Sequence, residues 1–415
     1  MSARAYITVV AIVWLGLSIG CVALSIFVDP YRMFGTRPIA GLTALKPRIY
    51  QQLGMAKTYQ LERIKPRTLL LGNSRVENGF DPQSSVLPAA DRPVFNAGLG
   101  GRDLFMAWRM LQEATAVAPV KTAILEVDFP DFLTNPAPES ASIPPLSDDE
   151  RRLKVGSDGL ANPHRGMQIW RDRLSATLTI SALFDSVSTL LDQRPRATVT
   201  MTELGFNPLN QYATDVKQFG YYQLFALKSA DYEERFRKYP HPDFLHPNQI
   251  EDFQHLARII RTAHQNNVRL ILFIPPYHAK LLEIIKGVGL WPSFENWKRA
   301  LVRVVDERTR ELAEPACNVD LVDFSGYNSY TMEPVPDNGD LRAQTRWYWE
   351  PGHYKAALGD VVLRRLVGGS RGFGQELTPD TVEATLARER DAAPASSQRA
   401  ADNPGRAPPD ARRER

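Results

Sequence analysis

The segment that most constrains the fold is an uncharged apolar run near the N-terminus. All 23 residues from Tyr6 to Val28 lack a charge. A helix of that length spans about 34 Å, enough to cross the hydrocarbon core of a bilayer. The run is long for the apolar part of a cleaved signal peptide, and no Ala-x-Ala site follows it. We therefore expect residues 1–28 to be an uncleaved transmembrane anchor; a buried core helix is the alternative.

Length and composition exclude several other classes of protein. At 415 residues, the chain can hold one large domain with insertions, or two domains. A formal net charge of +3 is too small to indicate nucleic-acid binding. Cys21 lies in the apolar run and Cys317 precedes a predicted strand, so we expect no disulfide between them. No Cys/His cluster has the spacing of a zinc site.

Beyond residues 29–66, which we interpret as a juxtamembrane connector, short apolar strands alternate with amphipathic helices. This alternation predicts a three-layer α/β/α domain with a mostly parallel five-stranded sheet. The expected strands are residues 68–71, 93–96, 122–127, 268–274 and 319–324, with helical periodicity at residues 104–111, 250–265, 297–312 and 354–362.

Two stretches depart from this alternation. Residues 134–250 form an insertion or cap, with a polar loop at 135–165 and helical periodicity at 167–192. We place it within an α/β domain of residues 67–370. Residues 371–415 become rich in Ala, Pro, Arg, Asp and Ser, which predicts a largely disordered tail, with disorder from about Ala392.

Two short segments carry candidate chemistry. Gly72-Asn73-Ser74-Arg75 follows the first strand, and Glu350-Pro351-Gly352-His353 lies almost three hundred residues later. A nucleophilic serine needs a base and a group that orients the base, and an acid three residues before a histidine can supply both. Together the segments predict an esterase-type site at the C-terminal rim of the sheet, where Gly101, Asp128 and Asp131 should also converge.

Each segment also has an interpretation without catalysis. Ser74 can be a polar residue of a βα turn, Glu350 a charge favoured at a helix N-terminus, and His353 a helix-terminal histidine. Val76 stands where the nucleophile elbow G-x-S-x-G needs glycine, which excludes that motif. Asp103 stands at the third glycine of G-x-G-x-x-G, which excludes a dinucleotide site.

In order and spacing, three blocks resemble the SGNH (GDSL-like) hydrolases, and above all their membrane-anchored branch related to alginate O-acetyltransferase-type envelope proteins. The blocks are Gly72-x-Ser74, Asn96-Ala97-Gly98-Leu99-Gly100-Gly101 and Glu350-x-x-His353. The resemblance covers roughly residues 67–370 without the insertion and implies an SGNH/flavodoxin-like fold. It implies Ser74 as nucleophile, His353 as general base and Glu350 as the orienting group, with the amides of Ser74 and Gly101 as oxyanion hole.

The chain departs from the family pattern at two positions. Glu350 replaces the usual aspartate, and Pro130 stands where the family has an asparagine oxyanion donor. We expect a serine esterase or O-acyltransferase, with acetyl as the acyl group, that acts on an envelope polysaccharide without a cofactor. By family analogy, a multi-spanning membrane acyltransferase could supply the acyl group. The alternative is a non-catalytic SGNH-like scaffold or glycan-binding protein, which the missing donor favours.

Further polar residues near the rim are candidates for substrate binding. Arg75 could bind an anionic group or only a carboxylate of the fold, and His278 could bind substrate or start a helix. The candidates are Arg75, Asp128, Asp131, His278 and Glu333. A metal site from Asp128, Asp131 and His278 lacks a defined ligand spacing, and we expect none. The aromatic residues Trp347, Tyr348, Trp349, Tyr327 and Tyr330 could stack on sugar rings or pack under the last helix.

The resemblance and the flanking charges disagree about topology. Envelope function implies a single-pass inner-membrane protein with a periplasmic domain. Basic residues in short loops remain cytoplasmic, however, and the charges after the run outnumber the one before it. Arg4 precedes the run, and Arg32, Arg37, Lys46 and Arg48 follow it.

Overall fold

A six-stranded sheet forms the centre of the protein. The computed structural model describes residues 2–133, 146–195, 198–312, 319–369 and 372–394, so Cys317 lies outside the described residues. The strand order is β2-β1-β3-β4-β5-β8, with the first five parallel and β8 antiparallel to β5. The strands are β1 Thr68–Leu71, β2 Val94–Asn96, β3 Thr122–Glu126, β4 Arg269–Ile274, β5 Val319–Asp323 and β8 Gln375–Glu376.

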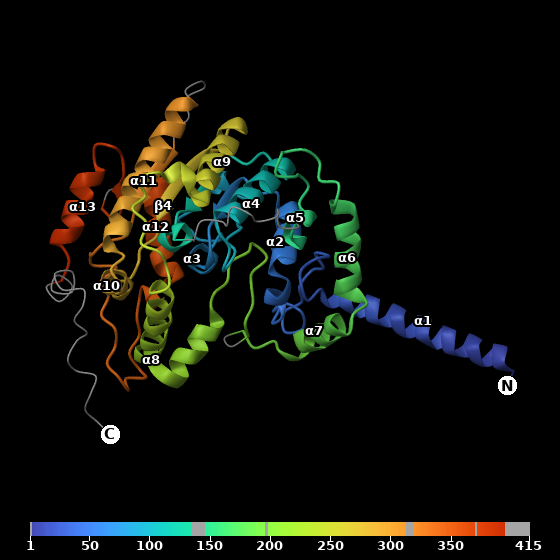
Figure 1. Cartoon of the computed structure of the whole chain (residues 1–415). Coiled ribbons are helices and arrows are strands. Elements are labelled where there is room, and N and C mark those ends of the chain that lie inside the picture. The colour runs from blue at the N-terminus through green and yellow to red at the C-terminus, as the bar shows by residue number, and fades with distance from the viewer. Residues whose placement is uncertain (1, 134–145, 196–197, 313–318, 370–371, 395–415) are drawn as a thin grey trace.

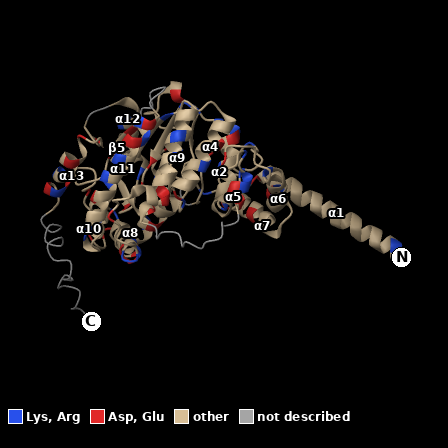
Figure 2. Cartoon of the chain, turned by 45° about the horizontal axis from the view of Figure 1, so that its top comes forward, with Lys and Arg blue, Asp and Glu red and all other residues tan. Residues whose placement is uncertain are grey.

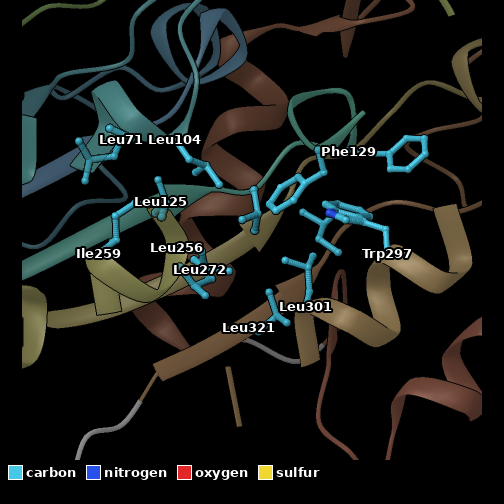
Figure 3. Close-up of a cluster of buried hydrophobic side chains, with 14 of the residues drawn as sticks. Leu71, Leu104, Leu125, Phe129, Leu256, Ile259, Leu272, Trp297, Leu301 and Leu321 are labelled. Atoms are coloured by element: carbon cyan, nitrogen blue, oxygen red, sulfur yellow. The ribbon is translucent and has the colours of Figure 1, made fainter. Parts of the chain in front are cut away.

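Helices cover both faces of this sheet, which confirms the α/β class and the five predicted strands (Figure 1). Side chains of successive strand residues point to opposite faces, so Leu69 and Leu71 enter one core while Leu70 enters the other. Figure 3 shows the larger core, where Leu125 and Leu272 lie against the helices that carry Leu256 and Trp297. The helices of this face are α2 Leu53–Ile64, α4 Leu104–Val117, α9 Glu251–Gln265 and α11 Trp291–Glu311; the other face has α3 Ser74–Gly79 and α12 Ala356–Gly368.

The described residues of the predicted insertion form four α-helices. Residues 167–192 form two of them: the first ends at Thr177, and Thr179 caps the second by accepting the N–H of Ala182 (3.1 Å). These two helices meet at an angle of 57°. The insertion helices are α5 Asp148–Arg152, α6 Arg165–Thr177, α7 Ile180–Leu191 and α8 Asn210–Phe236; the remaining elements are α10 Ala279–Gly287, α13 Val382–Asp391 and the two-stranded β6 Tyr348–Glu350 and β7 His353–Tyr354.

Two predicted boundaries need correction. The connector proposed at 29–66 belongs to the folded body, because α2 contributes Leu61 to the main core. Within the predicted tail at 371–415, residues 372–394 are folded and form β8 and α13. Leu386 is buried there, and the fully buried Lys298 ammonium contacts Glu389 (2.6 Å). This ion pair and apolar contact order a segment whose composition is mostly polar.

The N-terminal run is a single helix, α1 Ala3–Val28, that projects from the body (Figure 1). Figure 2 shows it free of charged residues beyond its first turn. Its large apolar side chains from Tyr6 to Ile19 are exposed, and it is long and apolar enough to cross a membrane. These properties are those of a membrane anchor or a signal sequence.

The layered core predicts a large difference between two leucine substitutions. Leu125 of β3 is 0% exposed, whereas Leu227 of α8 is 59% exposed. Leu125→Ala should lower the free energy of unfolding by about 2–5 kcal/mol, because it leaves a cavity between β3 and the helices. Leu227→Ala should change it by no more than about 0.5 kcal/mol. Urea unfolding of the detergent-solubilised chain measures both, and equal effects would contradict the placement of β3 in the core.

Candidate active site

The backbone at the end of β1 places Ser74 at the rim of the sheet. Gly72 adopts a φ of +150°, and a Cβ there would lie 2.6 Å from a carboxylate oxygen of Glu126, so the position requires glycine. Asn73 then caps α3 by accepting the N–H of Arg75 (3.0 Å). Ser74 is thus the first residue of α3, directly beyond the C-terminal end of a central strand.

Ser74, His353 and Glu350 form one hydrogen-bonded chain. His353 Nε2 lies 2.8 Å from Ser74 Oγ, and His353 Nδ1 contacts Glu350 Oε1. The second carboxylate oxygen of Glu350 accepts the N–H of Gly352 (2.8 Å). With Nδ1–H donating to Glu350, Nε2 can accept the proton of the serine hydroxyl. The structure therefore brings together three residues that the sequence separates by up to 279 positions.

The electrostatics of Glu350 favour its ionised form. Burial by itself raises the pKa of this carboxyl. The charge of His353, the hydrogen bonds from His353 and Gly352, and the more distant charge of Arg75 outweigh burial, so the pKa is lowered overall. Glu350 is fully buried, whereas the His353 side chain is 15% exposed. A buried carboxylate that holds a partly exposed imidazole is the arrangement that a serine nucleophile needs.

Gly352 lies between Glu350 and His353, where the Tyr232 side chain leaves little room for a Cβ. A Cβ at Gly352 would lie 1.8 Å from the hydroxyl oxygen of Tyr232 in α8. The tight turn that results lets β6 and β7 pair, with Glu350 opposite His353. The spacing of the acid and the histidine therefore follows from a two-stranded turn rather than from a helix.

The glycine turn after β2 lies beside Ser74. A Cβ built on Gly100 would be 3.6 Å from Ser74 Cβ, and the Gly100 amide donates to the buried Glu77 (3.1 Å). Gly101 adopts a φ of +71°. Within the described residues, the amides of Ser74 and Gly101 have no hydrogen-bond acceptor. Each amide can therefore donate a hydrogen bond to a group outside the described residues.

The segment after β3 has a buried ion pair and no asparagine donor at the position where the family has one. Pro130 is buried in the short turn Phe129–Phe132 and has no N–H. Asp128 instead forms a buried ion pair with Arg75 and accepts hydrogen bonds from Asn73 Nδ2 (2.8 Å) and the Tyr277 hydroxyl (2.6 Å). Arg75 and Asp128 thus contact each other. This contact agrees with the second of the two expectations for Arg75, a pairing with a carboxylate of the fold.

The other candidate side chains contact the fold in different ways. Burial and the charges of Asp128 and Glu126 raise the pKa of Asp131 well above its ordinary value. Glu333 accepts the amides of Trp347 (3.0 Å) and Tyr348 (3.1 Å), and so supports the strand that carries Glu350. Among the described residues, no group of three or more His, Cys, Asp or Glu side chains is arranged to hold a metal ion.

His278 has both ring nitrogens in hydrogen bonds of the fold. Nδ1 accepts the N–H of Lys280 (3.1 Å) as the cap of α10, and Nε2 donates to the carbonyl of Glu333 (2.9 Å). Its ring packs edge-on against Tyr348 and Phe225. These contacts match the structural interpretation of this residue as the start of a helix.

Aromatic residues of the insertion approach the loop that carries Glu350 and His353, and the sequence pattern did not reveal them. The Tyr212 ring meets His353 edge-on (6.3 Å between centroids), and Tyr221 stacks on Trp349 (6.5 Å). Lys355 lies 4.6 Å from both of the stacked rings. Tyr348, by contrast, is fully buried and packs in the core. The only sequence signal for Tyr212 and Tyr221 is a local concentration of tyrosine in α8.

His278 predicts a loss of stability in mild acid. Burial, with a smaller contribution from the charge of Lys280, lowers the pKa of His278 from 6.5 to about 4. A second proton on Nδ1 would also face the N–H of Lys280. The unfolded chain therefore binds this proton first as the pH falls below 6.5. Between pH 6.5 and 4 the folded state should lose up to about 3 kcal/mol from this group. Unfolding free energies at pH 7.5 and pH 5 measure this loss.

The matched variant for this test is His278→Asn. Asparagine keeps a side-chain oxygen that can cap α10 but does not take up a proton. Its difference in stability between the two pH values should be smaller than that of the wild type. His246→Asn, which replaces an exposed histidine, keeps His278 and should retain the wild-type difference. An unchanged pH dependence in His278→Asn would refute the assignment.

No protein-family model matches the chain, and no curated protein matches it either.

Proposed function

We propose that the chain is a membrane-anchored serine esterase or O-acyltransferase of the SGNH (GDSL-like) type that acts on a cell-envelope polysaccharide. The observation that carries this proposal is the hydrogen-bonded chain from Glu350 through His353 to Ser74. The strand order 2-1-3-4-5 of the parallel strands agrees with the expected flavodoxin-like arrangement. Ser74 lies beyond the carboxyl end of its strand, where ligands bind in such sheets.

The reaction proceeds through an acyl-enzyme. Ser74 Oγ attacks the ester carbonyl while its proton passes to His353 Nε2. The amides of Ser74 and Gly101 stabilise the resulting oxyanion, each by roughly 3 kcal/mol. His353 then gives its proton to the departing alcohol as the carbon–oxygen bond breaks. A sugar hydroxyl or water next loses its proton to His353 and attacks the acyl group. The bond between the acyl carbon and Ser74 Oγ then breaks, and His353 returns the proton to Oγ.

The surroundings of the site support a bulky substrate. Ser74 and His353 are both partly exposed, so an ester on a polymer can reach them without entering a closed cavity. Tyr212 lies beside His353 and edge-on to Trp349, and these two partly exposed rings offer faces on which sugars stack. The buried Tyr221 supports Trp349 from its other side. A multi-spanning membrane acyltransferase as acyl donor is part of this proposal.

The location that goes with this proposal is the periplasmic face of the inner membrane, with α1 as the anchor. The basic residues after α1 are the objection to it. Two of them have a purpose in the fold: Arg32 pairs with Glu203 (3.2 Å), and the buried Lys46 donates to the carbonyl of Val28. Their presence is thus explained without a topological signal.

A non-catalytic glycan-binding scaffold is the second candidate. Pro130 favours it, because the position that supplies a third oxyanion donor in the family carries no N–H. A serine-directed organophosphonate separates the two candidates, since only an activated Ser74 reacts with it.

Ester hydrolysis by the full-length protein in detergent tests the catalytic role directly. The wild type should cleave p-nitrophenyl acetate, and Ser74→Ala and His353→Ala should each reduce kcat by at least about a thousandfold. Ser329→Ala, which removes an exposed serine, should retain wild-type activity. If all four proteins are folded, equally inert and unlabelled by the organophosphonate, the scaffold is the better description.

Glu350 gives a finer test of the proposed geometry. Glu350→Gln keeps the shape of the side chain but can place an N–H against Nδ1, which favours the wrong tautomer of His353. Its kcat should fall by about 10²–10⁴-fold with little change in KM. Glu350→Asp shortens the contact by one methylene yet keeps the charge, so it should lie between Glu350→Gln and the wild type. An unaffected kcat in Glu350→Gln would show that Glu350 does not orient His353.

A further inference from the structure

Helices α6 and α7 are amphipathic, but their apolar sides face outward and their polar sides face the body of the protein. Their outward side carries large apolar side chains at helical spacing, and each is between 41% and 89% exposed. A helix on the surface of a water-soluble body shows the opposite pattern. We name this surface the α6–α7 apolar face; it consists of Met167, Trp170, Leu174, Leu178, Ile180, Phe184, Val187 and Leu191.

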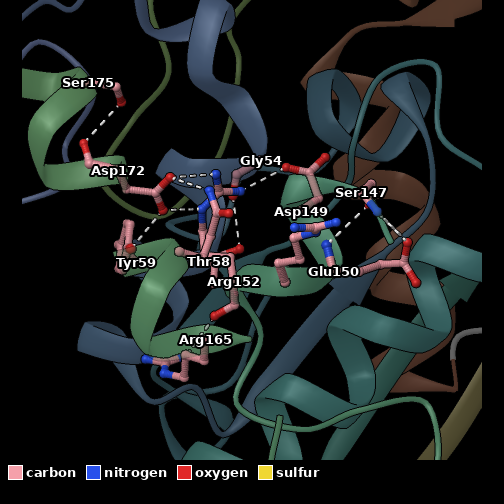
Figure 4. A network of polar contacts seen from close by, with 12 residues as sticks. Gly54, Thr58, Tyr59, Ser147, Asp149, Glu150, Arg152, Arg165, Asp172 and Ser175 are labelled. Atoms are coloured by element: carbon pink, nitrogen blue, oxygen red, sulfur yellow. Dashed lines mark hydrogen bonds and ion pairs between the residues drawn. The ribbon is translucent and has the colours of Figure 1, made fainter. Parts of the chain in front are cut away.

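The inward side of the two helices is polar and firmly held. Asp172 of α6 accepts hydrogen bonds from the Tyr59 hydroxyl (2.8 Å) and Arg152 Nε (2.6 Å), as Figure 4 shows. Asp185 of α7 accepts one from the Tyr31 hydroxyl (2.6 Å). Turning the helices to bury their apolar side would break these buried contacts. The apolar face therefore stays outward.

This face lies where α1 leaves the body. Ser25 and Val28 of α1 are buried, and Ser186 of α7 donates to Ser25 (3.4 Å). Ala176 of α6 packs in a small core with Tyr31, which follows α1 directly. In Figure 1, α6 runs across the root of α1, and α7 lies beside it. A bilayer crossed by α1 would thus meet α6 and α7 at its surface.

The composition of the face fits lipid better than a protein partner. Trp170 stands at its edge with the Arg173 guanidinium 5.9 Å from its ring, and Arg48 lies 5.5 Å from the ring of Phe184. Aromatic rings with arginines at the rim of an apolar face are typical of helices that lie in the headgroup region. Isolated water-soluble proteins rarely expose so continuous an apolar surface.

We propose that the α6–α7 apolar face lies in the interface of the bilayer beside α1. The chain then contacts the membrane twice, through a spanning helix and through two helices in the plane of the headgroups. This inference rests on the proposed membrane anchoring by α1, and it gives the first half of the insertion a function.

Spin-label accessibility in the full-length protein tests the proposal. Cys21 and Cys317 are replaced by alanine, and one cysteine is introduced per variant: Leu15→Cys, Leu174→Cys, Phe184→Cys or Glu307→Cys. Leu15 reports on the anchor, and Glu307 is an exposed residue of α11. The labelled proteins are reconstituted in vesicles of phosphatidylethanolamine and phosphatidylglycerol. Collision rates with oxygen, which concentrates in lipid, and with a water-soluble nickel complex give the environment of each label.

The expected result is a graded one. Label 15 should collide mainly with oxygen, label 307 mainly with nickel, and labels 174 and 184 with more oxygen than nickel at a shallower depth, about 5–10 Å below the headgroup boundary.

Four results would overturn the proposal. Labels 174 and 184 in water, with label 15 in lipid, would leave the anchor intact and refute the interfacial contact. Labels 174 and 184 as deep as label 15 would indicate a spanning hairpin, and low collision with both reagents would indicate a covering protein. Label 15 in water would refute the anchor and the interfacial contact together.

Discussion

The buried carboxylate of Asp128 joins the ends of three parallel strands, and the geometry of the rim depends on it. It pairs with Arg75 after β1, follows β3 itself, and accepts the hydroxyl of Tyr277 after β4. Tyr277 in turn accepts the amide of Phe129 (3.0 Å). Removal of one partner from such a buried pair would leave the other charge uncompensated, at a cost of about 3–5 kcal/mol. Because Arg75 is adjacent to Ser74, the contact that closes the rim also fixes the backbone of the candidate nucleophile.

The strands could be predicted closely, since parallel strands covered on both faces are short continuous apolar runs. Residues 68–71 coincide with β1, and the predicted strands at 268–274 and 319–324 differ from β4 and β5 by one residue at one end. Strand β8 has only two residues and pairs with β5 across the sequence, so no local periodicity marks it. The α13 segment was missed for a related reason: it is held by residues far away in the chain, among them Lys298 and the main core that Leu386 enters.

For the site, the sequence pattern predicted which residues meet but not all of their contacts. Order and spacing suffice to place Ser74 and His353 at one rim, because the carboxyl ends of parallel strands lie at the same edge of the sheet for any loop conformation. Whether Arg75 and Asp128 face a ligand or each other depends on side-chain packing, which periodicity does not encode. The position of Tyr212 beside His353 depends on how a long insertion folds back. Similarly, helical periodicity at 167–192 gives an apolar face for α6 and α7 but not its direction.

The junction between α1 and the body has a mechanical consequence. Asp29 accepts the amides of Phe34, Gly35 and Thr36, and Arg63 donates to the carbonyls of Arg32 and Met33. A flexible linker would let the rim that carries Ser74 move over a broad volume around the end of α1. These contacts instead hold the end of α1 against the body, so the tilt of α1 and the height of Ser74 above the end of the helix are linked. For the proposed membrane-anchored esterase or acyltransferase, the distance between Ser74 and the lipid would thus be set by the fold, and it would select acyl carriers and acceptors that present their ester at that height.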